Sequence, residues 1–426
     1  MKVLIVGSGG REDVLGWTIS KSEEVFVAPG NGGTKRFGEN VVIDKKNYIA
    51  NLYDFARENK IDLTIVGPEQ PLADGIVDYF EERGLLIFGP KKQGALLETS
   101  KVFAKEFARK SNIPTASFEI FEDSEKALKY ISKKDYPIVI KADGLCQGKG
   151  TFVCEDHKGA INAIEKIMED KIFGHAGDKI IIEDFIDGEE ASYIVFIDGE
   201  NFLSLPTSKD HKRIFDGDNG PNTGGMGAYS PTKIITQEIE EKIKKNMIVP
   251  TISELLNMGI KFKGILYFGI IIKNGDPYLL EYNTRFGDPE TQAIIPRLKS
   301  NLLEPIVATL EGRISKVQLE CDERKSLCVV VASGGYPGEY RKYKEIIGID
   351  EIDDPSIIVF HSGTEERDGK LLAVGGRVLS IVGLSEDMKT LKQKVYNAIS
   401  KVKFENMYFR TDIGDKEDQN GRMYIL

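Results

Sequence analysis

The sequence predicts an α/β protein that begins with a doubly wound parallel sheet. In the first hundred residues, four apolar segments ending in Gly or Pro alternate with helix-like segments such as NLYDFARENK. The apolar segments are KVLIVG (2–7), VFVAPG (25–30), LTIVGPE (63–69) and LLIFGP (85–90). Continuous apolar strands that alternate with helices are typical of a parallel sheet covered on both faces. Ligands of such a sheet bind beyond the carboxyl ends of its strands, so the loops there form the first candidate site.

Length and composition indicate a soluble protein of several domains. A chain of 426 residues is long enough for roughly two to four domains. A formal charge of -10 argues against a nucleic-acid-binding surface. The apolar run GILYFGIII (264–272) is far shorter than the roughly 20 residues of a membrane span. The four cysteines form no C-x-x-C pair, and no signal-peptide core is present, so we expect free thiols and a cytoplasmic location.

The first strand is followed by a glycine loop, GSGGRE (7–12), which invites a nicotinamide-cofactor interpretation. The G-x-G-x-x-G pattern breaks at Glu12, and the second strand ends in Ala-Pro-Gly rather than in an acidic residue. A loop for a phosphate or a small substrate therefore fits better. PGNGGT (29–34) and GPEQP (67–71) would lie beside it at the same sheet edge, although both could be ordinary turns.

The segment KADGLCQGKG (141–150) is similar to a phosphate-binding loop but lacks its metal-binding hydroxyl. A Walker A loop reads G-x-x-x-x-G-K-[ST], whereas here Gly148 comes one residue early and Gly150 follows Lys149. Glycines let backbone N–H groups approach phosphate oxygens, and flanking lysines add positive charge. An exposed turn with solvated lysines is the alternative. Any Mg²⁺ must find its protein ligands elsewhere.

Such ligands are predicted in PYLLEYNTRF (277–286). Period-two alternation places Leu279, Glu281 and Asn283 on one face of this strand. Mg²⁺ prefers oxygen ligands, which a carboxylate and an amide supply. Arg285 follows and could neutralise a carboxylate or phosphoryl oxygen. An exposed strand face with surface partners is the alternative.

Lys101, the loop after Lys141, EDFIDGEEAS (183–192) and LLEYNTRFGDPETQ (279–292) resemble the ordered elements of ATP-grasp ligases. Within that superfamily the chain resembles the glycinamide ribonucleotide synthetase family over nearly its whole length. The motifs that carry this resemblance are GSGGRE, PGNGGT, GPEQPLADG, KADGLCQGKG, KDHKRIFDGDNGPNTGGMGAYSP, NTRFGDPETQ and ASGGYPGEY. One departure is Asp13-Val14, where the family usually has His-Ala after its first loop.

The resemblance implies three domains. These are an N-terminal substrate-binding domain (1–100), a two-lobed ATP-grasp domain (101–326) with a mobile lid at about 118–190, and a small α+β domain (327–426). It also implies ATP-dependent ligation of glycine to 5-phosphoribosylamine in de novo purine biosynthesis, through a glycyl phosphate. ATP is then a co-substrate and Mg²⁺ or Mn²⁺ a cofactor. The partners are small molecules, with no nucleic acid or membrane, and the chain is expected to be a monomer.

The same resemblance assigns roles to residues. The expected ATP-binding residues, with Phe185 and Ile186 at the adenine and Glu190 at the ribose, are Lys101, Lys141, Gly144, Gly148, Lys149, Gly150, Glu183, Phe185, Ile186 and Glu190. Glu281 and Asn283 would bind the metal, Arg285 would stabilise the transferring group, and Asp210 would hold the ammonium of glycine. Asn222 and Thr223 would close over the acyl phosphate. Residues expected near the phosphoribosyl group are Gly9, Gly10, Asn31, Gly33, Thr34 and Glu69. Another ATP-grasp ligase and a non-catalytic ATP sensor remain the alternatives.

Overall fold

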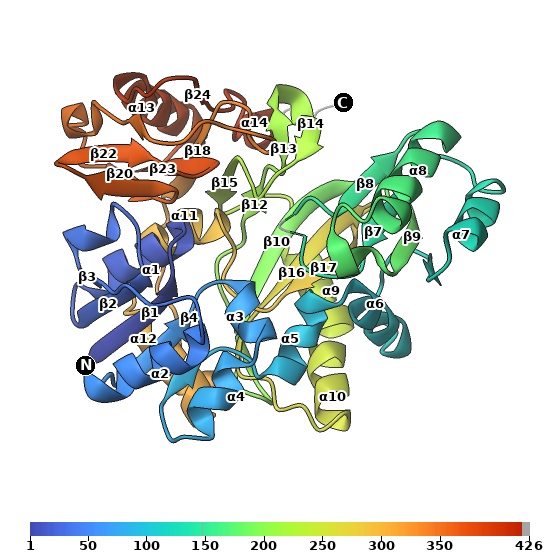
Figure 1. Cartoon of the computed structure of the whole chain (residues 1–426), viewed down its shortest axis with the longest axis horizontal. Coiled ribbons are helices and arrows are strands. Elements are labelled where there is room, and N and C mark those ends of the chain that lie inside the picture. Colours follow the sequence, from blue (N-terminus) through green and yellow to red (C-terminus); the bar gives the residue numbers. More distant parts are fainter. Residues whose placement is uncertain (147, 420–426) are drawn as a thin grey trace.

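The structure is a computed structural model that describes residues 1–146 and 148–419. In Figure 1 the N-terminal domain (blue) lies below the C-terminal domain (orange and red), and a small sheet (teal) projects to the right. Gln147, in the predicted phosphate loop, and residues 420–426, at the end of the predicted C-terminal domain, lie outside the described residues.

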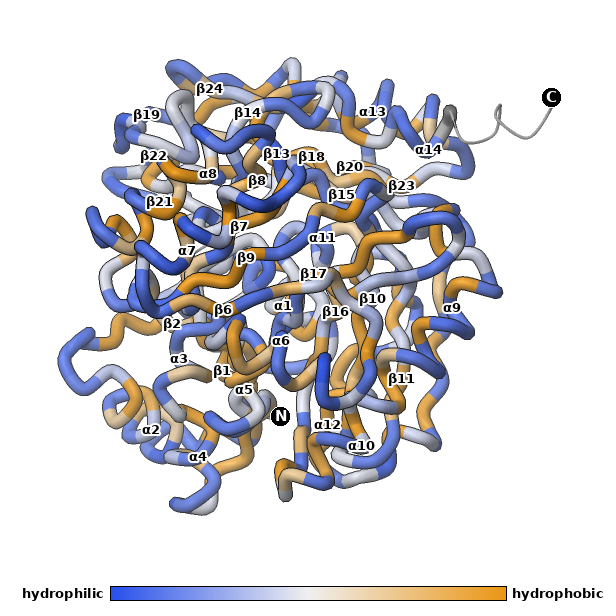
Figure 2. Tube along the Cα trace, turned by 90° about the vertical axis from the view of Figure 1, so that its right-hand side faces the viewer, coloured by the Kyte–Doolittle hydropathy of each residue, from blue (hydrophilic) through white to orange (hydrophobic). Residues whose placement is uncertain are grey.

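The N-terminal domain is a parallel sheet of strand order β3-β2-β1-β4-β5, which confirms the doubly wound prediction. Its strands are β1 (Lys2–Gly7), β2 (Glu24–Pro29), β3 (Glu39–Asn40), β4 (Leu63–Val66) and β5 (Ile87–Phe88). Its helices are α1 (Gly10–Ile19), α2 (Tyr48–Glu58), α3 (Glu69–Ala73), α4 (Ile76–Glu81) and α5 (Lys92–Thr99). The central strand β1 is apolar on both faces because it is covered on both, and it is orange in Figure 2. The strand order reverses at β1, so the loops after β1, β2 and β4 share one edge.

Two antiparallel sheets form the middle of the chain. The larger has the order β11-β10-β16-β17, with β10 (Glu189–Ile197), β11 (Phe202–Ser204), β16 (Gly264–Lys273) and β17 (Asp276–Asn283). The smaller has the order β6-β9-β7-β8, with β6 (Phe118–Phe121), β7 (Ile138–Ala142), β8 (Thr151–Cys154) and β9 (Ile180–Asp184). The helices are α6 (Lys101–Lys110), α7 (Ser124–Ile131), α8 (His157–Ile164), α9 (Gln237–Ile243), α10 (Val249–Asn257), α11 (Glu290–Ile294) and α12 (Leu303–Glu311). Ser100 caps α6, because its side chain accepts a hydrogen bond from the Phe103 N–H at 3.0 Å.

The predicted alternation along β17 is wrong at Leu279. The register against β16 shifts between the pairs Ile270↔Leu279 and Gly269↔Glu281, so Leu280 is an extra residue in a β-bulge. Leu279 therefore packs in the core with Tyr282, on the face opposite to Glu281. Glu281 and Asn283 lie beyond the bulge and share a face, as expected.

The C-terminal domain is built around a sheet that also takes strands from the middle of the chain. Its order is β12-β15-β18-β23-β20, with β24 paired to β18. The strands are β12 (Lys209–Asp210), β15 (Gly227–Ser230), β18 (Lys325–Ser333), β20 (Ile357–His361), β23 (Arg377–Ser385) and β24 (Met407–Tyr408). The remaining elements are the hairpin β13 (Arg213–Phe215) and β14 (Asn219–Asn222), the small sheet β19 (Lys344–Glu345), β21 (Thr364–Arg367) and β22 (Lys370–Ala373), and helices α13 (Met388–Lys401) and α14 (Asp415–Gln419). Segment 209–230 thus links the central region to the C-terminal sheet. Among the described residues, no helix has the length and apolarity needed to cross a membrane.

Candidate active site

A buried cluster of two lysines and one glutamate lies where β7 and β9 face β17. Lys141 Nζ is 3.0 Å from Glu183 Oε1, and Lys105 Nζ is 3.0 Å from Glu183 Oε2. Lys141 also donates to the Leu280 carbonyl, at the bulge, at 3.2 Å. Burial alone would raise the pKa of Glu183, but the two lysines outweigh it and lower that pKa. For Lys105, burial is the larger effect and lowers the pKa to about 8. Lys141 is therefore fixed beside β17 by a charged partner.

The glycine loop lies between α6 and the C-terminal domain. Lys101 Nζ donates to the Gly144 carbonyl at 2.7 Å. Lys149, expected at the phosphates, instead donates to the Pro337 carbonyl at 2.8 Å. A Cβ added at Gly148 would lie 2.8 Å from the Thr223 carbonyl oxygen, so this loop approaches segment 222–225 closely. Only a residue without a side chain fits there, where φ is +76°.

The predicted metal pair lies within a charged group. Lys212 Nζ lies 3.2 Å from Glu190 Oε2 and 3.6 Å from Glu281 Oε1, so it links the predicted ribose and metal ligands. Burial would raise the pKa of Glu281, but Lys212, followed by Lys141, lowers it. A methyl at Gly269 would lie 3.0 Å from Glu281 Cγ, so that glycine leaves room for the carboxylate. Asn283 Oδ1 accepts from Arg285 Nη2 at 3.1 Å.

Asp210 is buried at the end of β12, next to this group. Burial raises the pKa of its carboxyl to about 7, Lys212 opposes that shift, and Glu290 reinforces it. Glu290 is itself buried and accepts from Tyr267 Oη at 2.8 Å and Ser192 Oγ at 3.1 Å. A buried carboxylate close to other acids suits the binding of a cationic amine.

Arg285 connects these residues to the N-terminal domain. Its Nε lies 3.4 Å from Glu69 Oε2, and its Nη2 lies 2.9 Å from Glu98 Oε1. Glu98, at the end of α5, also accepts from the Thr284 N–H at 2.7 Å. Although burial would lower the pKa of Arg285, Glu98 and Glu69 raise it. The guanidinium is thus held by two carboxylates from the N-terminal domain and by Asn283.

In the N-terminal loops, the predicted phosphate-binding amides bind side chains of their own loops. The Gly9 N–H donates to Glu12 Oε2 at 2.5 Å. The amides of Gly33 and Thr34 donate to Asn31 Oδ1 at 2.7 and 3.1 Å. Gly10 begins α1, where a Cβ would lie 2.5 Å from Gln292 Nε2. A phosphate could reach these amides only if the side chains moved aside.

The unusual Asp13 joins the N-terminal and C-terminal domains. Its Oδ2 accepts from Arg36 Nη2 at 2.8 Å and from the His361 N–H at 2.9 Å. Burial raises its pKa to about 7, and Arg36 opposes that shift. Its contacts are therefore structural, which gives a role to the position that departs from the family pattern.

Phe185, Ile186 and Asn222, also predicted from the sequence, lie outside the charged group around Lys141, Lys212 and Arg285. Phe185 and Ile186 lie in the link from β9 to β10, which belong to different sheets, and Phe185 is 39% exposed. Asn222 pairs with Arg213 in the β13–β14 hairpin.

Sequence analysis missed several residues that organise the site. They are Glu98, Lys105, Lys212 and Glu290. Lys212 and Glu290 lie inside two of the motifs that carry the resemblance, KDHKR and GDPETQ, and this position is a signal for them in the sequence. Glu98 and Lys105 lie on helices, where nothing local distinguishes an inward charge from a solvated one.

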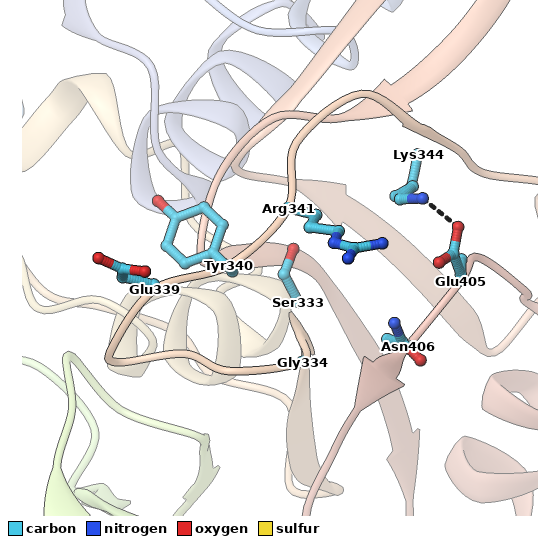
Figure 3. Close-up of a pocket in the computed structure, with 8 residues that line it drawn as sticks. All are labelled: Ser333, Gly334, Glu339, Tyr340, Arg341, Lys344, Glu405 and Asn406. Atoms are coloured by element: carbon cyan, nitrogen blue, oxygen red, sulfur yellow. Dashed lines mark hydrogen bonds and ion pairs between the residues drawn. The ribbon is translucent and has the colours of Figure 1, made fainter.

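A pocket of about 470 Å³ lies apart from these residues, in the C-terminal domain. Its lining is Ser333, Gly334, Glu339, Tyr340, Arg341, Lys344, Glu405 and Asn406, with an ion pair between Lys344 and Glu405 (Figure 3). None of the individual site residues predicted from the sequence lines it, although Ser333, Gly334, Glu339 and Tyr340 belong to the motif ASGGYPGEY.

Comparisons with known proteins agree with this architecture. Three domains described as phosphoribosylglycinamide synthetase match the chain: the N domain at residues 1–98, the ATP-grasp domain at 99–291 and the C domain at 326–416. A phosphoribosylamine–glycine ligase of Caldanaerobacter subterraneus subsp. tengcongensis is 46% identical over 416 residues, which cover 97% of this chain and 99% of that protein. A crystal structure of phosphoribosylamine–glycine ligase from Thermotoga maritima is similar with a TM-score of 0.84 and 35% identity, covering 97% of this chain and 100% of that one.

A more distant structure shares the fold alone. The biotin carboxylase domain of Hydrogenobacter thermophilus 2-oxoglutarate carboxylase, in complex with MgADP, has a TM-score of 0.70 at 15% identity and covers 96% of this chain and 91% of that one. The match to the ATP-grasp domain at residues 99–291 confirms the ATP-grasp architecture expected from the sequence.

Proposed function

The chain belongs to the phosphoribosylglycinamide synthetase family, and we propose that its buried group of charged side chains catalyses the family's ATP-dependent ligation of glycine to 5-phosphoribosylamine. The products are N1-(5-phosphoribosyl)glycinamide, ADP and phosphate, in de novo purine biosynthesis. One observation carries the proposal: Arg285 reaches Glu69 of the N-terminal domain and Asn283 of β17 at the same time. Substrates held by these two regions would meet at this guanidinium.

Ligation requires activation of a carboxylate, which is a poor electrophile at neutral pH. A carboxylate oxygen of glycine attacks the γ-phosphorus of ATP, the bond to the ADP oxygen breaks, and glycyl phosphate forms. The amine of phosphoribosylamine then attacks the glycyl carbonyl carbon, the bond to phosphate breaks, and the nitrogen loses a proton. Arg285 and Lys141 would neutralise the charge on the transferring group, and Asp210 would hold the ammonium of glycine.

Glu281 and Asn283 fit a hard divalent cation, because both present oxygen atoms on one face beyond the bulge. Within residues 1–146 and 148–419, no three His, Cys, Asp or Glu side chains group to hold a metal ion, so further ligands would be substrate or water oxygens. ATP-grasp ligases use ATP with divalent metal ions, and we propose Mg²⁺ or Mn²⁺ here. The ion would supply neutralisation of phosphate charge, and Lys212 and Arg285 would release the two side chains to it.

The remaining assignments belong to the same proposal. Lys101, Lys149 and the glycines of segment 144–150 would contact the phosphates, Phe185 and Ile186 the adenine, and Glu190 the ribose. The N-terminal loops would bind the phosphoribosyl group, with Glu69 near a sugar hydroxyl. We further propose domain boundaries at 1–100, 101–326 and 327–426 and a lid at about 118–190. The partners would be small molecules only, and the protein would be a cytoplasmic monomer.

Release of ADP by the purified protein tests this function. Mg-ATP is supplied with glycine and phosphoribosylamine, the latter made in situ from ribose 5-phosphate and ammonia, separately and together. We expect stoichiometric ADP and product only with both substrates. ADP release that depends on neither substrate, or release with formate in place of glycine, would contradict the proposal, and the latter would indicate a sister ligase.

A further inference from the structure

Two side chains of the C-terminal domain hold the glycine-rich segment 222–225 from both sides. The Gly224 N–H donates to Tyr336 Oη at 3.0 Å, and the Gly224 carbonyl accepts from Arg377 Nη1 at 2.8 Å. Backbone polar groups in a turn usually bond within the turn or to water. Here both groups of one glycine bond to a different domain.

Arg377 also binds the loop that follows β17. Its Nη1 donates to the Asp288 carbonyl at 2.7 Å and lies 3.3 Å from Asp288 Oδ1. Asp288 Oδ2 in turn accepts from the Arg11 N–H, in the first N-terminal loop, at 3.4 Å. One guanidinium therefore ties segment 222–225 to the strand that carries Glu281 and Asn283.

Segment 222–225 has little freedom to lie elsewhere. Gly225 has a φ of +116°, and a Cβ there would lie 2.4 Å from Pro289 Cδ. The Thr223 carbonyl lies against Gly148 of the glycine loop, and Lys149 of that loop binds Pro337, next to Tyr336. The same part of the C-terminal domain thus contacts both loops that would cover the reacting groups.

We propose that Arg377 and Tyr336 are positioning residues that hold segment 222–225 over the acyl phosphate and so keep water from it. This inference rests on the proposed ligase function. Glycyl phosphate that meets water instead of the amine is hydrolysed, and ATP is then consumed without product. Loss of positioning should therefore appear as uncoupling, which a general loss of stability does not produce.

The test measures the ratio of ADP to ligated product in Arg377→Met, Arg377→Lys and Tyr336→Phe. Wild type should give about one ADP per product, as the reaction stoichiometry requires. Arg377→Met should raise the ratio roughly threefold or more, with glycine-dependent ADP release in the absence of phosphoribosylamine. Arg377→Lys keeps the charge and should restore part of the coupling, and Tyr336→Phe should give a smaller rise. Arg341→Met, which removes an exposed arginine of the same domain, should keep the wild-type ratio.

A ratio near one in both Arg377→Met and Tyr336→Phe would overturn the inference, whatever their turnover rates. Should Arg377→Met fail to fold, Tyr336→Phe decides alone, because it removes only a hydroxyl. Failure of wild type to require both substrates would instead contradict the ligase function, so the two failures are distinguishable.

Discussion

The half of the site around Lys141 and Lys212, called the charged half below, is built from charged side chains that face one another, whereas the N-terminal half is built from backbone amides. In the first half, Lys141 pairs with Glu183, and Lys212 lies between Glu190 and Glu281. In the second half, Asn31 already accepts the amide hydrogens of its own loop. A ligand would exchange ion pairs in the charged half, whereas in the N-terminal half it would displace hydrogen bonds that backbone amides donate to Asn31 and Glu12. The first half should therefore respond to charge and pH, and the second to loop geometry.

Arg285→Met should have the largest effect, because Arg285 belongs to both halves. We expect kcat/KM to fall by about 10³ for every substrate, the scale seen when a charge that stabilises a transition state is removed. The change also leaves Glu69 and Glu98 as unpaired neighbours. Steady-state kinetics beside thermal unfolding separate the two effects, with Arg285→Lys as the charge-keeping control. A tenfold loss or less would break the account of Arg285 as the meeting point.

Glu281→Gln should lower turnover through the charged half of the site alone. We expect about a 10²-fold loss of turnover that higher Mg²⁺ or Mn²⁺ concentration partly restores, since the amide keeps one oxygen but loses the charge. Metal titration of the ADP-release rate measures this. Glu119→Gln, on an exposed position of β6, is the matched control and should titrate like wild type. An unchanged metal requirement in Glu281→Gln would remove Glu281 from the metal site.

The pH dependence of glycine use should report Asp210. Burial raises the pKa of its carboxyl to about 7, so the group gains a proton and loses its charge as the pH falls below that value. Since only the charged form attracts an ammonium, kcat/KM for glycine should fall about tenfold per pH unit below 7. Asp210→Asn should be slow at all pH values and lack this acid limb. Persistence of the same limb in the variant would assign it to another group.

Asn31→Ala should give the smallest effect and sharpen the contrast between the halves. Removal of the amide oxygen frees the Gly33 and Thr34 N–H groups but unties their loop. We expect the KM for phosphoribosylamine to rise about tenfold, equivalent to the loss of one or two neutral hydrogen bonds, with the KM for ATP unchanged. An equal rise in both KM values would show that the halves are not independent.

The contrast between charged side chains and backbone amides also explains which parts of the fold and the site could be predicted from the sequence. The parallel sheet could be predicted from local periodicity, and the motifs with charged side chains pointed to Lys141, Glu281, Asn283 and Arg285, which the structure places in one charged group. The side of β17 on which Leu279 lies could not be predicted in this way, because a bulge depends on pairing with β16. The occupation of the N-terminal amides by Asn31 and Glu12 also needs three-dimensional loop geometry.

The residues of the other domains that contact the site also could not be predicted from the sequence. Glu98 and Arg377 contact residues that are far away in sequence, Arg285 and Gly224. Neither lies in a local pattern that separates it from a solvated charge. The contribution of the C-terminal domain therefore becomes visible only when its strands are seen joined to segment 209–230.

Activation of glycine by phosphorylation of its carboxylate is the step on which the proposed function depends, and isotope transfer tests it most directly. Glycine labelled with ¹⁸O in both carboxylate oxygens is converted with Mg-ATP and phosphoribosylamine, and the inorganic phosphate is analysed by mass spectrometry. The account predicts one ¹⁸O atom in the phosphate for each product formed, because the carboxylate oxygen leaves with the phosphoryl group. Phosphate without the label, with product still formed, would contradict the glycyl phosphate route.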